Sequence, residues 1–171
     1  HQGKVEEAEK FFIQAMSDRD PDYNDLLTLG RCLRLMRRMD KAETILGQAC
    51  ELEPGKPEAH YELGLLYKQT GRFRKAADKF EYLLELDGEY SQVCLTDLGV
   101  CYWQMGFFAR ARDVFNRAIA LKPDDIKVYI DLGFRYREGG KFIEAESLLN
   151  KALELNPRSS LALVGLGHSR L

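Results

Sequence analysis

Five Leu-Gly pairs at almost constant spacing constrain the fold of this chain more than any other feature. Successive pairs lie 34, 35, 34 and 34 residues apart, a regularity that chance does not produce. The pairs are Leu29-Gly30, Leu63-Gly64, Leu98-Gly99, Leu132-Gly133 and Leu166-Gly167. A constant period of this length indicates that one small structural unit is repeated along the chain.

Each repeat carries the same residue types at the same positions. In the first half, Leu, Gly and, in three repeats, Tyr share a spacing that places them on one face of a helix turning about 100° per residue. In the second half, small and bulky apolar residues alternate at spacings of four and three, as in Ala76, Phe80 and Leu83 or Ala145, Leu149 and Ala152. The pattern predicts two amphipathic helices per repeat that meet at small residues.

A glycine separates the two predicted helices, at Gly71, Gly106 and Gly140, where a tight turn needs a left-handed backbone. Arg37 takes this place in the first repeat, where a positive φ would cost roughly 1 kcal/mol or more. We therefore predict that the first turn is built differently. Capping residues and first-turn prolines predict helix starts at Asp20-Pro21, Lys56-Pro57, Asp124-Asp125 and Ser159.

The pattern resembles the tetratricopeptide repeat over essentially the whole chain. The resemblance implies an all-α fold, a right-handed superhelical solenoid of antiparallel helix pairs that forms one domain over residues 1–171. The repeats are expected at 23–56, 57–91, 92–125 and 126–159, with the second helix of a partial repeat at 3–22 and the first helix of another at 160–171. We expect the chain to be an internal fragment of a longer array. One extra residue around 88–91 predicts a local change of superhelical twist.

The resemblance further implies a concave groove lined by the first helix of each repeat. On a helical wheel, the residues three before, one after and four after the repeat glycine point away from the partner helix and into this groove. They include Leu27, Arg31, Arg34, Tyr61, Leu65, Lys68, Val100, Trp103, Ile130, Phe134 and Arg137. Large apolar patches are rarely left exposed, and Trp, Tyr and Arg are enriched among binding hot spots, so this surface is interpreted as a ligand site. For Trp103, the alternative of packing against a neighbouring repeat stays open.

These features predict a non-catalytic protein-interaction scaffold that binds a peptide or helix of a partner through apolar anchors. Basic groove residues are expected to pair with acidic ligand residues, although Glu58, Glu62, Asp97 and Asp131 dilute the basic character. The family's clamp for chaperone tails is not expected, because other residue types stand at its positions. Two alternatives remain: the targeting arm of a larger enzyme, such as a glycosyltransferase, and a scaffold that self-associates through exposed end repeats.

The amino-acid composition limits the classes of partner that we expect. The formal net charge is −2, so no strong positive field predicts binding to nucleic acid, and the basic run from Arg31 to Arg38 is interpreted as a helix edge and groove rim. No apolar run has the length of a membrane span, so we expect no membrane insertion and a cytoplasmic location. The four cysteines lack metal or disulfide spacing and are expected to be reduced.

Nothing in the sequence predicts an enzyme, a cofactor or a metal site. The three histidines lie far apart, and no nucleophile, base and orienting group converge in the repeat pattern. His60 occupies a bulky apolar position and is interpreted as a partly buried structural residue. His168 falls on the groove side, where it is a candidate for ligand contact.

Overall fold

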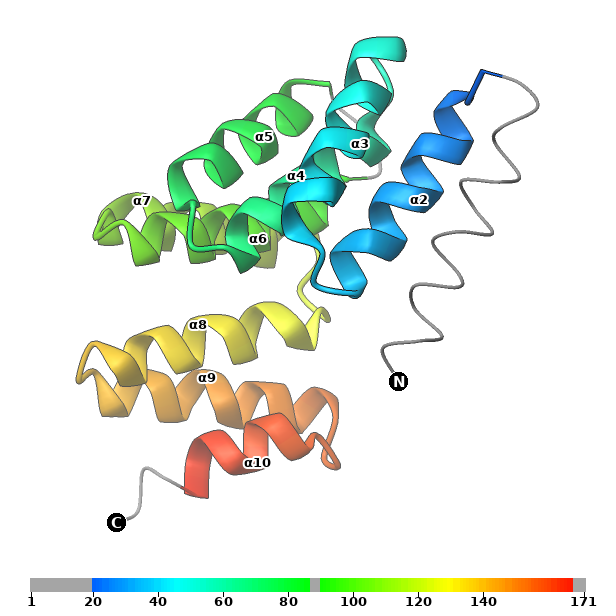
Figure 1. The fold of residues 1–171 in the computed structure, drawn as a ribbon. Coiled ribbons are helices and arrows are strands. Elements are labelled where there is room, and N and C mark those ends of the chain that lie inside the picture. Colours follow the sequence, from blue (N-terminus) through cyan, green and yellow to red (C-terminus); the bar gives the residue numbers. More distant parts are fainter. Residues whose placement is uncertain (1–19, 87–89, 168–171) are drawn as a thin grey trace. The chain divides into compact units, whose positions relative to one another are not determined.

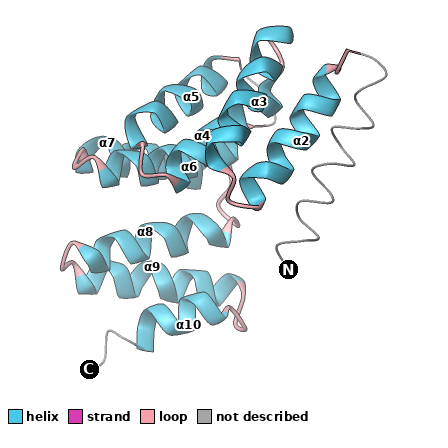
Figure 2. Ribbon diagram, in the orientation of Figure 1, coloured by secondary structure: helices cyan, strands magenta, loops and turns pink. Residues whose placement is uncertain are grey.

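The structure, a computed structural model, describes residues 20–86 and 90–167. Within those ranges the secondary structure is helical, with short connecting loops and no strand (Figure 2). The helices are α2 (Tyr23–Leu35), α3 (Met39–Leu52), α4 (Pro57–Gln69), α5 (Phe73–Glu85), α6 (Ser91–Gln104), α7 (Phe108–Leu121), α8 (Ile126–Glu138), α9 (Phe142–Leu155) and α10 (Ser160–Gly167). The all-α prediction is confirmed.

Successive helices pair as antiparallel hairpins, α2 with α3, α4 with α5, α6 with α7 and α8 with α9 (Figure 1). The repeat glycine is the point of closest approach within each hairpin. A Cβ atom at Gly64 would lie 2.6 Å from the Phe80 ring, and one at Gly133 would lie 2.9 Å from Leu149. Both bulky partners are fully buried, so the glycine is required for the second helix to pack at this distance.

Each turn inside a hairpin contains one residue in the left-handed backbone conformation. Gly140 has a φ of 74°; its N–H donates to the carbonyl of Arg137, and the next N–H donates to Tyr136. Arg37 adopts the same conformation, with a φ of 63° and the equivalent pair of hydrogen bonds. The prediction of a different first turn is therefore wrong. The two hydrogen bonds and the packed hairpin outweigh a conformational cost of about 1 kcal/mol.

Most predicted helix starts are confirmed. Pro57 is the first residue of α4, and the Asp125 side chain accepts a hydrogen bond from the N–H of Lys127 at the start of α8. For α2, however, the cap is Asp22 rather than Asp20-Pro21. Its carboxylate accepts from two backbone N–H groups, while Asp25 accepts from the backbone N–H of Asp22, so a reciprocal capping box fixes the start.

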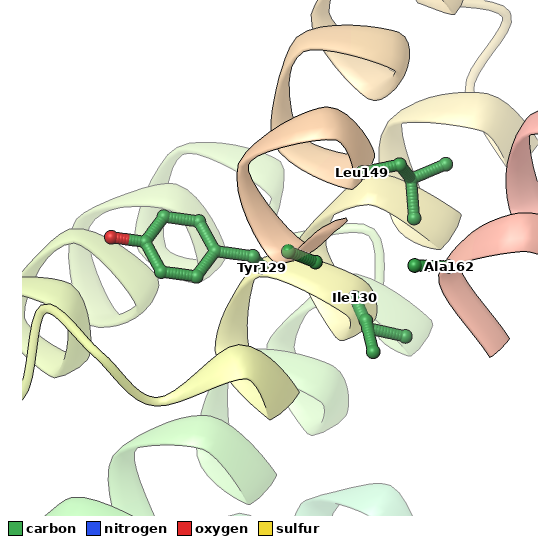
Figure 3. Close-up of a cluster of buried hydrophobic side chains, with 5 residues drawn as sticks. Tyr129, Ile130, Leu149 and Ala162 are labelled. Carbon is green, nitrogen blue, oxygen red and sulfur yellow. The ribbon is translucent and has the colours of Figure 1, made fainter. Parts of the chain in front are cut away.

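The chain divides into two compact units, His1–Gly88 and Glu89–Leu171, here called the first and second unit. In the second unit, a buried cluster joins α8, α9 and α10, and Figure 3 shows Ile130, Leu149 and Ala162 converging in it. A single solenoid over 1–171 stays a prediction. The partial repeat expected at 3–22 and the extra residue around 88–91 fall largely or partly on 1–19 and 87–89, outside the described residues.

All four cysteines are free thiols, as expected from their spacing. Burial, reinforced by the charge of Asp97, raises the pKa of Cys94 to about 12, so its thiol stays protonated at neutral pH. None of the described helices combines the length and apolar character needed to cross a membrane.

Candidate functional site

The first helices of the first unit carry half-buried apolar residues at the predicted groove positions. Leu27 packs at the margin of a buried cluster, and Leu65 on α4 is similarly half-exposed. The Tyr61 ring lies 6.0 Å from the Phe80 ring, in a tilted arrangement, and keeps part of its surface exposed. Lys68 is also half-buried. These side chains lie beside the core and keep part of their surface exposed.

Two of the predicted basic groove residues are held inside the first unit. Arg31 donates from Nε to one carboxylate oxygen of Glu62 at 2.7 Å, and Arg34 donates to the other at 2.8 Å. The side chains of Arg34 and Glu62 are only 8% and 6% exposed. The expectation that Arg34 pairs with a ligand is therefore wrong, because the helical wheel of α2 does not show the carboxylate that α4 places beside it. Arg31 keeps about half of its side chain exposed.

In the second unit, the predicted groove residues divide into exposed and buried ones. Val100 and Phe134 are half-buried, and Phe134 packs against the α8–α10 cluster. Ile130 is 6% exposed and belongs to that cluster, so its predicted exposure is wrong: α10 covers it. Arg137 lies over the Phe134 ring at 4.9 Å and donates to the Gly165 carbonyl of α10.

Trp103, the only tryptophan in the chain, lies at the turn end of the second unit. Its ring meets Phe108, the first residue of α7, edge to face at 4.8 Å between centroids and Tyr136 of α8 at 5.9 Å. A Cβ atom on Gly139 would lie 3.3 Å from the indole. Trp103 therefore packs against the following repeat while remaining half-exposed, the arrangement that sequence reasoning had kept open as an alternative.

Beside the Trp103 ring lies a pocket of about 350 Å³, which we call the turn-end pocket. It is bounded by the start of α7, the end of α8 and the α8–α9 turn. Its lining consists of Trp103, Phe108, Ala109, Arg112, Tyr136, Glu138, Gly139 and Lys141. Apolar walls with a few polar groups are typical of ligand pockets.

The charges at the turn-end pocket are mainly positive. Arg112 and Lys141 are both exposed, and Lys141 lies 5.5 Å from the centre of the Tyr136 ring. The one acidic lining residue, Glu138, is held by Arg135 at 2.6 Å. Sequence reasoning missed Arg112 and Lys141 because both lie outside the first-helix positions on which the groove prediction was built.

His60 is buried, as predicted, with 8% of its surface exposed. Its Nε2 atom lies 3.0 Å from the Pro54 carbonyl, and its ring lies 4.7 Å from that of Tyr82. Burial and the charge of Lys79 lower the pKa of His60. The residue is therefore a neutral structural group in α4. The other histidine proposed for ligand contact, His168, lies outside the described residues.

Three models of the tetratricopeptide repeat match the chain, over residues 27–92, 69–132 and 126–159. The chain belongs to the tetratricopeptide repeat family. Together the three matches extend over every hairpin described above. No curated protein matches the chain.

Solved structures of other tetratricopeptide proteins have the same fold. A crystal structure of MamA shares 24% identity at a TM-score of 0.76, covering 93% of this chain and 92% of its own. A tetratricopeptide repeat protein from Parabacteroides merdae shares 20% identity at a TM-score of 0.82, covering 98% and 66%. A crystal structure of the APC/C hetero-tetramer Cut9–Hcn1 shares 20% identity at a TM-score of 0.78, covering 98% of this chain and 33% of the matched chain. Identities this low establish the fold alone.

Proposed function

We propose that the chain is a non-catalytic protein-interaction scaffold that binds a segment of a partner protein along the first helices of its repeats. The tetratricopeptide fold indicates a protein-interaction scaffold in general terms. The observation that carries the specific proposal is the presence, in each unit by itself, of half-exposed apolar side chains on these helices. They are Leu27, Tyr61 and Leu65 in the first unit, and Val100 and Phe134 in the second.

The structure changes the expected balance of contacts at these helices. Arg34 is neutralised by Glu62, and Arg137 is engaged with α10, so the basic residues contribute less to the exposed surface than the sequence implied. Burial of apolar surface contributes about 25 cal/mol per Å², and several partly exposed side chains give a ligand a substantial area to cover. We therefore expect apolar anchors to dominate binding at this face.

Site-specific photocrosslinking tests this face directly. A photoreactive phenylalanine analogue replaces Leu65 or Val100 in the full chain, and cell extract of the source organism supplies the ligand. Matched controls carry the analogue at Gln48 of α3 or Asn150 of α9, both exposed on second helices. We expect a crosslinked protein at Leu65 and Val100 and none at the controls. Crosslinks confined to Gln48 and Asn150 would contradict the proposal.

A second candidate function, self-association, is favoured by one observation. Leu161 and Leu163 of α10 are 61% and 51% exposed, although both are large and apolar. A second copy of the chain would bury them by packing against α10. Sedimentation velocity over a range of concentrations measures this: the wild type is expected to dimerise and a Leu161→Ser/Leu163→Ser variant to stay monomeric. A wild type that remains monomeric at every concentration would remove this candidate.

A further inference from the structure

The turn-end pocket has a counterpart in the first unit, and the two differ in charge. Gly30 and Gly99 are 69 residues apart, as are Gly64 and Gly133, so helices α2–α5 correspond position by position to α6–α9. Under this correspondence, Arg112 stands where Glu43 stands in the first unit, and Lys141 stands in place of Arg72.

In the first unit, the Glu43 carboxylate joins the two hairpins. Arg72 donates from Nη1 to Glu43 Oε2 at 2.7 Å, and the Tyr67 hydroxyl donates to the same carboxylate. Arg72 also lies over the Tyr67 ring at 4.7 Å and donates to the Thr70 hydroxyl. Partial burial opposes ionisation of Glu43, but the donors from Arg72 and Tyr67 prevail and lower its pKa.

In the second unit, the same place has the donors but lacks the carboxylate. Tyr136 corresponds to Tyr67 and lines the turn-end pocket, and Lys141 supplies the cation. Arg112 supplies a second cation where the anion stood. Among the residues that the structure describes, neither Arg112 nor Lys141 forms an ion pair. Two cations beside one pocket favour the entry of an anion.

The side chains around this place differ in size as well as in charge. Thr70, which donates to its own helix and accepts from Arg72, is replaced by Gly139, which has no side chain and lets the Trp103 indole lie 3.3 Å from the place of a Cβ atom. Arg34 is replaced by Trp103, whose indole forms an apolar wall with Phe108. The result is an open pocket in which cationic groups adjoin an aromatic surface.

We propose that the turn-end pocket binds an acidic side chain from a partner protein, with its carboxylate between Arg112 and Lys141 and an adjacent apolar side chain on Trp103 and Phe108. The carboxylate takes the place that Glu43 occupies in the first unit and accepts hydrogen bonds from the two cations and from the Tyr136 hydroxyl. Glu138 does not oppose it, because Arg135 holds that carboxylate. A volume of about 350 Å³ suits one or two side chains rather than a whole helix.

This inference rests on the proposed function only in that the ligand is a segment of a protein. The pocket is formed at the turns, whereas the proposed binding face follows the first helices, so crosslinking at Leu65 tests one and substitution at Arg112 tests the other. Either can fail without the other.

The test uses selection from a phage-displayed library of random short peptides on the immobilised full chain. Three proteins are compared: the wild type, Arg112→Glu, which supplies the missing carboxylate from within, and Arg117→Glu. Arg117 is an exposed residue of the same helix outside the pocket, so its substitution changes the net charge equally. Circular dichroism verifies that all three have the same helical content. The most enriched peptide is then synthesised with capped ends, in a Glu or Asp form and in the corresponding amide form, and its affinity is measured by fluorescence anisotropy.

We expect the wild type and Arg117→Glu to enrich peptides that contain an acidic residue beside an apolar one. Replacing the acidic residue by its amide, or Arg112 by Glu, should weaken binding about tenfold or more, the usual size for loss of a charge-assisted hydrogen bond. Arg117→Glu should change affinity less than about twofold. Peptides without an acidic preference, equal losses in both variants, or no enrichment on the wild type would each overturn the proposal.

Discussion

The hairpins α2–α5 and α6–α9 have equivalent helices and turns but join neighbouring repeats in different ways. In the first unit, carboxylates link them: Glu62 binds Arg31 and Arg34, and Glu43 binds Arg72. In the second unit, aromatic rings meet at the corresponding places, and the position of Glu43 carries a cation.

The difference shows which positions of this repeat are fixed by the fold and which are available for function. The glycine that admits Phe80 in the first unit has an equivalent that admits Leu149 in the second, so hairpin closure is retained. The residues between repeats vary in charge without altering the backbone plan. An internal ion pair in one unit can therefore become an open site for an external carboxylate in the other.

The largest expected effect comes from breaking the carboxylate link of the first unit. Glu62→Ala leaves Arg34 buried without its partner, and loss of one member of a buried ion pair costs about 3 kcal/mol or more. The equivalent change in the second unit, Asp131→Ala, removes a half-exposed carboxylate 3.8 Å from Lys127 and should cost less than about 1 kcal/mol. Urea unfolding followed by circular dichroism measures both. Equal losses would show that the two units do not differ here.

A smaller effect is expected from substitutions at the equivalent turn positions Arg37 and Gly106. Arg37→Gly removes the strain of a left-handed non-glycine residue and should raise the free energy of unfolding by about 1 kcal/mol. The opposite change, Gly106→Ala, should lower it by a similar amount, since Gly106 has a φ of 81°. Thermal unfolding of both variants measures the two effects. Loss of stability in Arg37→Gly would mean that the arginine side chain contributes more than its backbone strain costs.

Charge exchange at the turn end should have a still smaller effect on stability. Arg112→Glu creates a carboxylate opposite Lys141 and should stabilise the second unit by about 0.5 kcal/mol, the usual scale of a partly exposed pair. Glu43→Arg should destabilise the first unit by a comparable amount, because it removes the acceptor of Arg72. Both are read from unfolding midpoints in low salt, with Arg117→Glu as the control. A neutral Arg112→Glu variant would break the correspondence between the two pockets.

The smallest expected effect is a pH dependence confined to the first unit. The pKa of His60 is lowered by burial and by Lys79, so below the unfolded value of about 6.5 the unfolded state binds more protons than the folded one. Stability should therefore be complete above pH 6.5 and fall as the pH falls below it. Tyr129 occupies the equivalent place in the second unit, and its hydroxyl donates to the Pro123 carbonyl just as His60 contacts that of Pro54.

His60→Tyr should abolish this component of the pH dependence, because the tyrosine hydroxyl does not titrate in that range. The measurement is the free energy of unfolding between pH 5.5 and 7.5 for both proteins, a range set by the ordinary pKa of histidine, about 6.5. Identical pH profiles would show that His60 does not contribute.

The repeat pattern was sufficient to predict the hairpins, because the constraint that forms them is local. A glycine on the first helix faces a bulky residue on the second, sixteen positions later in Gly64 and Phe80, and that spacing can be read from the chain. The tolerated strain at Arg37 was not predicted, since the packing of a whole hairpin outweighs the preference of one residue.

The candidate site was predicted only in part, because its members depend on neighbouring repeats. A helical wheel places Arg34 and Ile130 on an exposed face, but Glu62 and α10 enclose them from other repeats. The turn-end pocket was missed because Arg112 and Lys141 lie outside the first-helix positions from which the groove was predicted. A signal for it was present in the sequence, as a reversal of charge between Glu43 and Arg112 at equivalent repeat positions.

The fluorescence of Trp103 tests whether the turn-end pocket binds a carboxylate. It is the only tryptophan of the chain and lines this pocket, so its emission reports on the site alone. The full chain is titrated with the selected capped peptide in its acidic and amide forms. We predict a saturable change in emission with the acidic form, and a curve shifted about tenfold or more both with the amide form and in Arg112→Glu. The same curve for both peptide forms, or an unaltered curve in Arg112→Glu, would show that the turn-end pocket is not a carboxylate site.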